Sequence, residues 1–136
     1  MNQIYNNARY RMLTATLNWL SEPMVLSAWS GTPDFNPVDK VIGEIKVRGN
    51  IELAWATPIT QTVTFDGIAQ TSNVIVPGID VGETVTWFTM SDRFPSHDAS
   101  ELILFIDDAY ELPFYGNGLD MEVRPDWLDN RGWFRP

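Results

Sequence analysis

The sequence predicts a mainly β protein, an antiparallel β-sandwich or small barrel that is preceded by a short helix. From residue 50 onward, apolar and polar residues alternate with the period of two that is typical of half-buried strands. Gly, Pro, Asn and Asp turn signals separate these short runs, as they do in all-β domains. The 136 residues suit one domain with a core of its own, so we expect a single domain over residues 1–136.

The N-terminal segment predicts a helix over about residues 3–16, ahead of a β core over about 17–125. Apolar residues recur there every three or four positions, which is the period of one helix face. The residues of that face are Ile4, Ala8, Met12 and Ala15. Met12 and the neighbouring Leu13 are expected to be either core residues or contacts with a partner.

The segment between the helix and residue 50 predicts one strand and a second short helix. Residues 16–30 form the first strand region, in which Pro23 marks a break or a sheet edge. Turn-forming residues fill 31–37. Residues 38–46 have helical spacing, although Gly43 weakens a helix there.

Six later segments predict strands, and some of them carry further expectations. These segments are 51–57, 60–67, 73–78, 83–90, 101–108 and 119–125. Trp55 alternates onto the same side as Ile51 and Leu53, which predicts a core position. Residues 101–108 are the most apolar run and predict a central strand that is buried on both faces. Gly116–Gly118 predicts a hairpin turn with Gly or Asn at positive φ, and the last five residues predict a final short strand.

The composition excludes several classes of site. The chain has no cysteine, so disulfides and thiolate metal sites are excluded, and its single histidine argues against a His-based zinc site or a Ser-His-Asp triad. No run approaches the roughly 18 to 20 apolar residues of a membrane span. The N-terminus also lacks the apolar segment of a secretory signal. We therefore expect no membrane partner.

The formal net charge of −9 argues against nucleic acid as a partner, because an acidic protein repels phosphate backbones. The charge is unevenly spread. Residues 1–21 hold Arg9 and Arg11 and no acid, whereas residues 50–92 hold five acids and no Lys or Arg. Such an asymmetry can steer head-to-tail or adaptor contacts, although a solubilising surface is the simpler interpretation.

The carboxylates suggest no strong metal or catalytic site. Five acids lie at the end of one predicted strand, at the start of the next and between the two, namely Asp107, Asp108, Glu111, Asp120 and Glu122. Calcium prefers several oxygen ligands, but these acids do not have the spacing of a calcium loop. No pair of acids stands out as a glycosidase pair. His97 lies in a polar segment and is expected to be an exposed loop residue. We therefore predict no catalytic residue, no metal site and no cofactor.

The C-terminal tail, about residues 126–136, combines aromatic and charged residues. Trp and Arg are the residue types most enriched in binding hot spots, and a chain end is usually loose unless it docks. The candidate partner-binding residues, together with Met12 and Leu13, are Trp127, Arg131, Trp133, Phe134 and Arg135. The alternative is that the tail packs on the protein's own core.

Several short motifs occur in an order that carries a family resemblance. They are Tyr5–Arg9, Val41–Ile45, Asp66–Ala69, Leu102–Asp107, Leu112–Pro113 and Asn117–Gly118. In this order, the chain resembles a widespread family of small structural proteins of tailed bacteriophages. Glu111 and Leu119 depart from the glycines that the family favours at these positions, and the C-terminus is longer and more aromatic than the usual ending.

The resemblance implies a non-enzymatic role in a virion that assembles in the cytoplasm of a bacterial host. The expected partners are the major capsid protein or tail proteins, and the chain itself as a homo-oligomer. Capsid decoration or cement is the leading expectation, and a tail, neck or baseplate adaptor is the first alternative. A second alternative is a carbohydrate- or receptor-binding module of a tail fibre, which would use exposed tryptophans such as Trp55 and Trp87.

Overall fold

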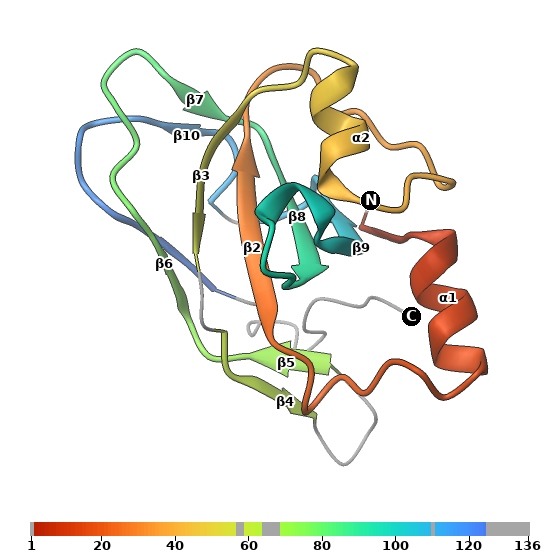
Figure 1. The fold of residues 1–136 in the computed structure, drawn as a ribbon. Coiled ribbons are helices and arrows are strands. Elements are labelled where there is room, and N and C mark those ends of the chain that lie inside the picture. The colour runs from red at the N-terminus through yellow and green to blue at the C-terminus, as the bar shows by residue number, and fades with distance from the viewer. Residues whose placement is uncertain (1, 57–58, 64–68, 110, 125–136) are drawn as a thin grey trace.

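The main sheet of the protein is five-stranded and antiparallel (Figure 1). The computed structural model describes residues 2–56, 59–63, 69–109 and 111–124. Within them, the strand order of this sheet is β1-β9-β8-β2-β3. The strands are β1 (Gln3–Ile4), β9 (Glu101–Ile106), β8 (Trp87–Asp92), β2 (Met24–Trp29) and β3 (Glu52–Ala56).

A second layer of three short antiparallel strand pairs packs beside the main sheet. The pairs are β7 (Thr84–Val85) with β10 (Phe114–Tyr115), β6 (Val74–Val76) with β11 (Met121–Val123), and β4 (Gln61–Val63) with β5 (Ala69–Thr71). β6 runs alongside β2 and β3, and buried apolar side chains from both layers form one core. The predicted mainly β, sandwich-like fold is therefore confirmed, and the described strands do not close into a barrel.

The predicted N-terminal helix is confirmed, but it is shorter than expected. α1 spans Asn6–Leu13, and the two residues before Tyr5 instead form β1, in which Gln3 pairs with Phe105. The second helix, α2, spans Ile42–Val47 and begins later than the predicted 38–46. A 3₁₀ turn, η1 (His97–Ala99), lies against α2.

The first strand is also shorter than the predicted region, because only Met24–Trp29 pairs on both sides. The preceding segment turns back and packs instead. Leu17 and Trp19 pack against the core between the two layers, and the indole Nε1 of Trp19 donates to the backbone oxygen of Thr62 at 2.8 Å. Pro23 therefore lies just before the strand, where a missing N–H is tolerated.

Both faces of the main sheet are buried. The first core lies between the sheet and the second layer and also includes Ala8 of α1, and the second core lies under α2. The second core consists of Tyr5, Trp29, Ile42, Ile45, Trp87, Leu102 and Phe105. Its largest members, Trp29 and Trp87, stack with ring centroids 5.2 Å apart. Trp29 also donates from Nε1 to the Thr89 hydroxyl at 2.9 Å, which satisfies its polar atom inside the core.

The apolar run at 101–108 forms β9, and its burial on both faces is confirmed. It is also an interior strand, because it pairs with β8 on one side and with β1 on the other, although β8 is the strand in the middle of the sheet. The short strand β1 and an isolated bridge at Val41 cover the outer side of β9. That cover explains how β9 can be as apolar as the middle strand.

The predicted core position of Trp55 is wrong. Trp55 is 38% exposed and Ile51 is exposed, while Ala54 and Ala56 face the first core. Ala54 and Ala56 pair with Ala28 and Leu26, which face the first core, so Trp55 between them faces the other side. The pairing shifts after Ala28, where Leu53 is an extra residue of β3, so Leu53 packs against the first core and does not share a side with Trp55.

Two loops on the far side from α1 are fastened together, and we call residues 77–83 and 115–120 the loop pair (Figure 1). The amide of Gly116 donates to the Glu83 oxygen at 2.7 Å, and the amide of Gly118 donates to the Ile79 oxygen at 2.8 Å. Gly118 has φ +81, as predicted for this turn. The predicted hairpin is nevertheless wrong, because β10 and β11 on either side of the turn pair with different strands.

Candidate functional site

The α1 helix presents an apolar surface to solvent. Ala8 is buried, whereas Tyr10, Met12 and Leu13 are exposed, and Leu13 is 89% exposed. Arg9 is exposed beside them, with no ion-pair partner among the described residues. Met12 and Leu13 are therefore not core residues, and their contact with a partner stays a prediction.

The other predicted partner-binding residues lie outside the described part of the chain. They are Trp127, Arg131, Trp133, Phe134 and Arg135. The final short strand predicted for the last five residues lies outside it as well.

An ion-pair cluster fastens α1 to the end of the main sheet. Arg11 donates to Asp92 at 2.8 Å and lies 3.3 Å from Glu101 and 4.0 Å from Glu22. Asn7 donates to Glu101 at 3.3 Å. Burial raises the pKa of Asp92, while the hydrogen bond from Arg11 lowers it and the Glu22 charge raises it further. The net direction is upward, so keeping Asp92 ionised costs folding free energy.

Replacing Asp92 by asparagine should change how stability depends on pH. A carboxyl whose folded pKa is raised contributes stability that is full below its unfolded pKa, about 3.9, and is lost as the pH rises through the folded pKa. We therefore expect wild-type stability relative to Asp92→Asn to fall across that window. Urea unfolding from about pH 3.5 to 7 measures it. A difference that does not change with pH, or that grows with pH, would contradict the raised pKa.

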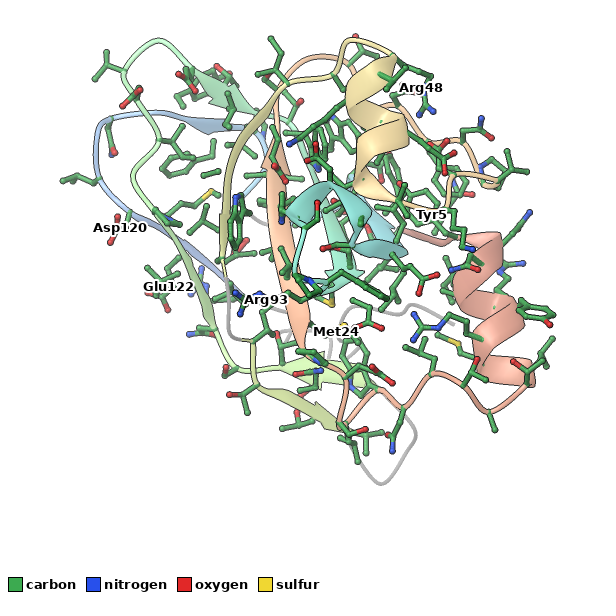
Figure 2. The ribbon with its side chains drawn as sticks, in the orientation of Figure 1. Tyr5, Met24, Arg48, Arg93, Asp120 and Glu122 are labelled. Atoms are coloured by element: carbon green, nitrogen blue, oxygen red, sulfur yellow. The ribbon has the colours of Figure 1, made fainter. Side chains whose placement is uncertain are left out.

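A second cluster ties the loop before α2 to the end of that helix (Figure 2). The Arg48 guanidinium donates to both oxygens of Asp39 at 2.7 Å and to Asp34 at 2.9 Å. Asn50 also donates to Asp34, at 2.8 Å. The hydrogen bonds from Arg48 and then Asn50 hold the pKa of Asp34 below its usual value. Asp39 is buried, and the two hydrogen bonds from Arg48 offset the cost of burying its charge.

Replacing Arg48 by methionine should lower the unfolding free energy by about 2 kcal/mol. Removing one partner of a buried pair leaves an uncompensated charge, but Arg48 itself is partly exposed, which moderates the loss. The unfolding free energy of Arg48→Lys should lie between those of wild type and Arg48→Met, because lysine keeps the positive charge but cannot donate the two parallel hydrogen bonds of a guanidinium. Chemical denaturation measures all three, and a lysine variant as unstable as the methionine variant would contradict the role of the charge.

His97 belongs to a cluster that was not expected from the sequence. Its side chain is only 17% exposed, so the predicted exposed loop histidine is wrong. Its Nε2 lies 2.9 Å from Glu52, and its ring stacks on Trp55 with centroids 4.3 Å apart. Lys46 lies 3.5 Å from Glu52. Sequence reasoning missed this cluster because Glu52 and Trp55 are far from His97 in the sequence and meet it only through the fold.

Lys46 links this cluster to the η1 turn. Its ammonium lies 2.7 Å from Asp98. Burial lowers the pKa of Lys46, but the hydrogen bond to Asp98 and the Glu52 charge outweigh burial and raise it overall. The same hydrogen bond lowers the pKa of Asp98. The histidine and lysine are thus engaged with carboxylates, while part of the Trp55 indole faces solvent.

The acids that follow β9 and the acids at β11, Asp120 and Glu122, do not converge on one point. Glu111 accepts from the Arg124 amide at 2.7 Å, and Glu122 accepts from Asn73 at 2.7 Å. Asp120 and Glu122 point away from the main sheet in Figure 2. The described residues contain no group of three or more His, Asp or Glu side chains placed to hold a metal ion.

The loop pair presents a second apolar surface, of opposite charge to α1. Val81 is 80% exposed and Tyr115 is 72% exposed, and Leu119 is also exposed. Asp80 and Asp120 are exposed beside them. The loop pair contains no Lys or Arg in its sequence. The loop pair is therefore an acidic surface with exposed apolar side chains, and backbone hydrogen bonds hold its two loops together.

No protein-family model matches the chain, and no curated protein or solved structure matches it significantly. Among the described residues, no helix has the length and apolar character needed to cross a membrane.

Proposed function

We propose that this chain is a non-enzymatic structural component of a tailed bacteriophage particle, with capsid decoration or cement as its leading role. The observation that carries the proposal is how the family-like motifs are arranged in space. Tyr5–Arg9, Val41–Ile45 and Leu102–Asp107 are far apart in sequence, yet they build one structural unit around the second core.

The backbone contacts of this unit are specific. The amide of Tyr5 donates to the Ile103 oxygen at 3.1 Å, and the amide of Leu102 donates to the Lys40 oxygen at 2.8 Å. The second core takes apolar side chains from all three motifs. Motifs that pack against one another make a resemblance in their order more meaningful than short matches scattered over a surface would be, which supports the family proposal.

The proposed work is mechanical. Side chains fill the space on both faces of the main sheet, and the exposed apolar residues of α1 and the loop pair lie at its periphery. Small exposed apolar surfaces on a well-packed domain are suited to a protein that binds between the subunits of a larger assembly. The same features suit a tail, neck or baseplate adaptor, which remains the alternative position in the particle.

The number of copies per purified particle tests this proposal. Quantitative mass spectrometry against the major capsid protein should find the chain in the particle. Hundreds of copies support capsid decoration or a tail-tube position, and a few to a few dozen support the neck, baseplate or fibres. Absence from purified particles, with the protein present in the producing cells, would overturn the structural role.

A carbohydrate-binding module of a tail fibre is the second candidate, and the exposure of Trp55 favours it. Sugar-binding sites use exposed aromatic rings as stacking platforms, and Trp55 is partly open to solvent. However, His97 already stacks on one side of its indole, and Trp87 is fully buried. A single half-open ring is a small platform, which ranks this function below the structural one.

A glycan array separates the two candidates. Binding tighter than about 1 mM that Trp55→Ala abolishes would favour the carbohydrate module. Leu119→Ala is a matched control, because it removes an exposed apolar side chain from a different surface. Binding that survives Trp55→Ala would place any glycan site elsewhere.

A further inference from the structure

The surface of α1 is cationic and apolar on a protein that is acidic overall. Residues 1–21 contain Arg9 and Arg11 and no acid, within a chain of net charge −9. Arg11 is engaged with Asp92, which leaves Arg9 as the exposed cation beside Tyr10 and Leu13. The surface therefore fits an acidic partner that also carries apolar side chains.

The loop pair has the complementary properties. Its exposed apolar residues are Val81, Tyr115 and Leu119, and its acids are Asp80, Glu83 and Asp120. The hydrogen bonds from Gly116 and Gly118 hold its two loops in one arrangement. A surface that is already ordered loses less conformational entropy on binding than a loose loop does.

The two surfaces lie on opposite sides of the molecule, with the main sheet between them (Figure 1). They cannot meet within one chain, but they can meet between two copies. We propose that the α1 surface of one copy docks on the loop pair of a second copy, in a head-to-tail contact. This inference goes beyond the proposed role in a particle, because it specifies how copies of the chain join to one another.

Such a contact is heterologous, because it joins two different surfaces of the same chain. Each docked copy then presents another free α1 and another free loop pair, so the contact repeats into a closed ring or an open filament. A contact that joins one surface to itself would instead stop at a dimer. The stoichiometry of association therefore distinguishes the two geometries.

Two single variants test the contact, one on each surface. Leu13→Asp places an acid on α1 against the acidic loop pair, and Val81→Arg places a cation on the loop pair against Arg9. Both positions are exposed in one chain, so the fold should persist. In sedimentation velocity of the purified full-length chain, wild type should form oligomers, and each variant should weaken association at least about tenfold.

Mixing the two variants gives the decisive result. The Leu13→Asp chain keeps a native loop pair and the Val81→Arg chain keeps a native α1, so these two native surfaces join the two chains, and the two changed surfaces then meet with opposite charges. The mixture should therefore form mixed oligomers of alternating composition that neither variant forms alone. Combining both changes in one chain should restore oligomers, because the new charges attract one another. Val47→Asp and Val47→Arg are the controls, since Val47 is an exposed apolar residue at the end of α2; both should associate like wild type.

Three results would overturn the proposal. Wild type that shows no association tighter than about 1 mM would remove the contact altogether. Association that either single variant leaves intact, or a mixture that associates no better than each variant alone, would exclude the head-to-tail geometry. These measurements use purified protein, so their failure is separate from a failure to find the chain in particles.

Discussion

Replacing Trp87 by alanine should lower the unfolding free energy by about 4 kcal/mol, the largest loss that we expect from a single change. Trp87 is fully buried, stacks on Trp29 and lies with its centroid 5.5 Å from that of Phe105. Removing the indole creates a large cavity under α2, and the surrounding strands cannot collapse into it because the first core packs their other face. Urea unfolding followed by far-ultraviolet circular dichroism measures the loss.

Trp55→Ala is the matched control for this prediction. It removes the same side chain from the same sheet, but from a position that is 38% exposed. We expect a loss of about 1 kcal/mol, from the contact with His97 and the partly buried ring. Equal losses for the two variants would contradict the assignment of Trp87 to the core and Trp55 to the surface.

Gly116→Ala should lower the unfolding free energy by about 3 kcal/mol. A Cβ atom at this position would overlap the backbone oxygen of Asp80 and lie 2.9 Å from that of Glu83. Both neighbours are backbone atoms, so neither can move aside as a flexible side chain would. The two loops must separate, which weakens the Gly116–Glu83 hydrogen bond and the β7–β10 pairing.

Gly82→Ala, in the same loop pair, separates crowding from backbone strain. Gly82 has φ +93, and a Cβ atom at this position would meet only open space, so alanine there should cost about 1 kcal/mol from conformation alone. We expect Gly116→Ala to be clearly more unstable in denaturant titrations. A Gly116→Ala variant as stable as Gly82→Ala would contradict the close approach of Gly116 to the backbone of Asp80 and Glu83.

The pattern of apolar residues predicted the longer strands. β3 and β11 lie within segments that alternate, and β6 and β9 lie within apolar runs. Such a pattern is a local property, so it identifies a strand but not its neighbours in the sheet. For that reason the sequence predicts that β9 is a buried interior strand, but not that β1 and β8 are its partners.

Pairing between distant segments explains the elements that were missed. β1 and β10 have two residues each, which is too short for a periodic signal, and they exist because β9 and β7 offer partners. The extra residue in β3, Leu53, depends on how β3 pairs with β2, and no feature of residues 51–57 reports it. Trp55 is exposed because the smaller Ala54 and Ala56 face the first core, and alternation alone does not show which side of a strand is buried.

The candidate surfaces were predictable only in part. The charge asymmetry suggested head-to-tail contacts, and Met12 and Leu13 were named as core or contact residues. Their exposure was undecided because the helical period alone does not show which face is buried. Tyr5, just before α1, is fully buried and fixes that choice together with Ala8. The loop pair needed the structure, since residues 77–83 and 115–120 meet only through the fold.

The pairing of β1 with β9 has a consequence for synthesis on the ribosome. The first residues of the chain leave the exit tunnel long before their partner strand, Glu101–Ile106, has been translated. A nascent chain that ends before Glu101 leaves the hydrogen-bonding edge of β8 open and lacks two of the seven buried residues of the second core, Leu102 and Phe105. Sheets that join distant parts of a chain fold slowly. We therefore expect this domain to acquire its structure only after β9 has been translated, and its unfinished chains to rely on chaperones until then.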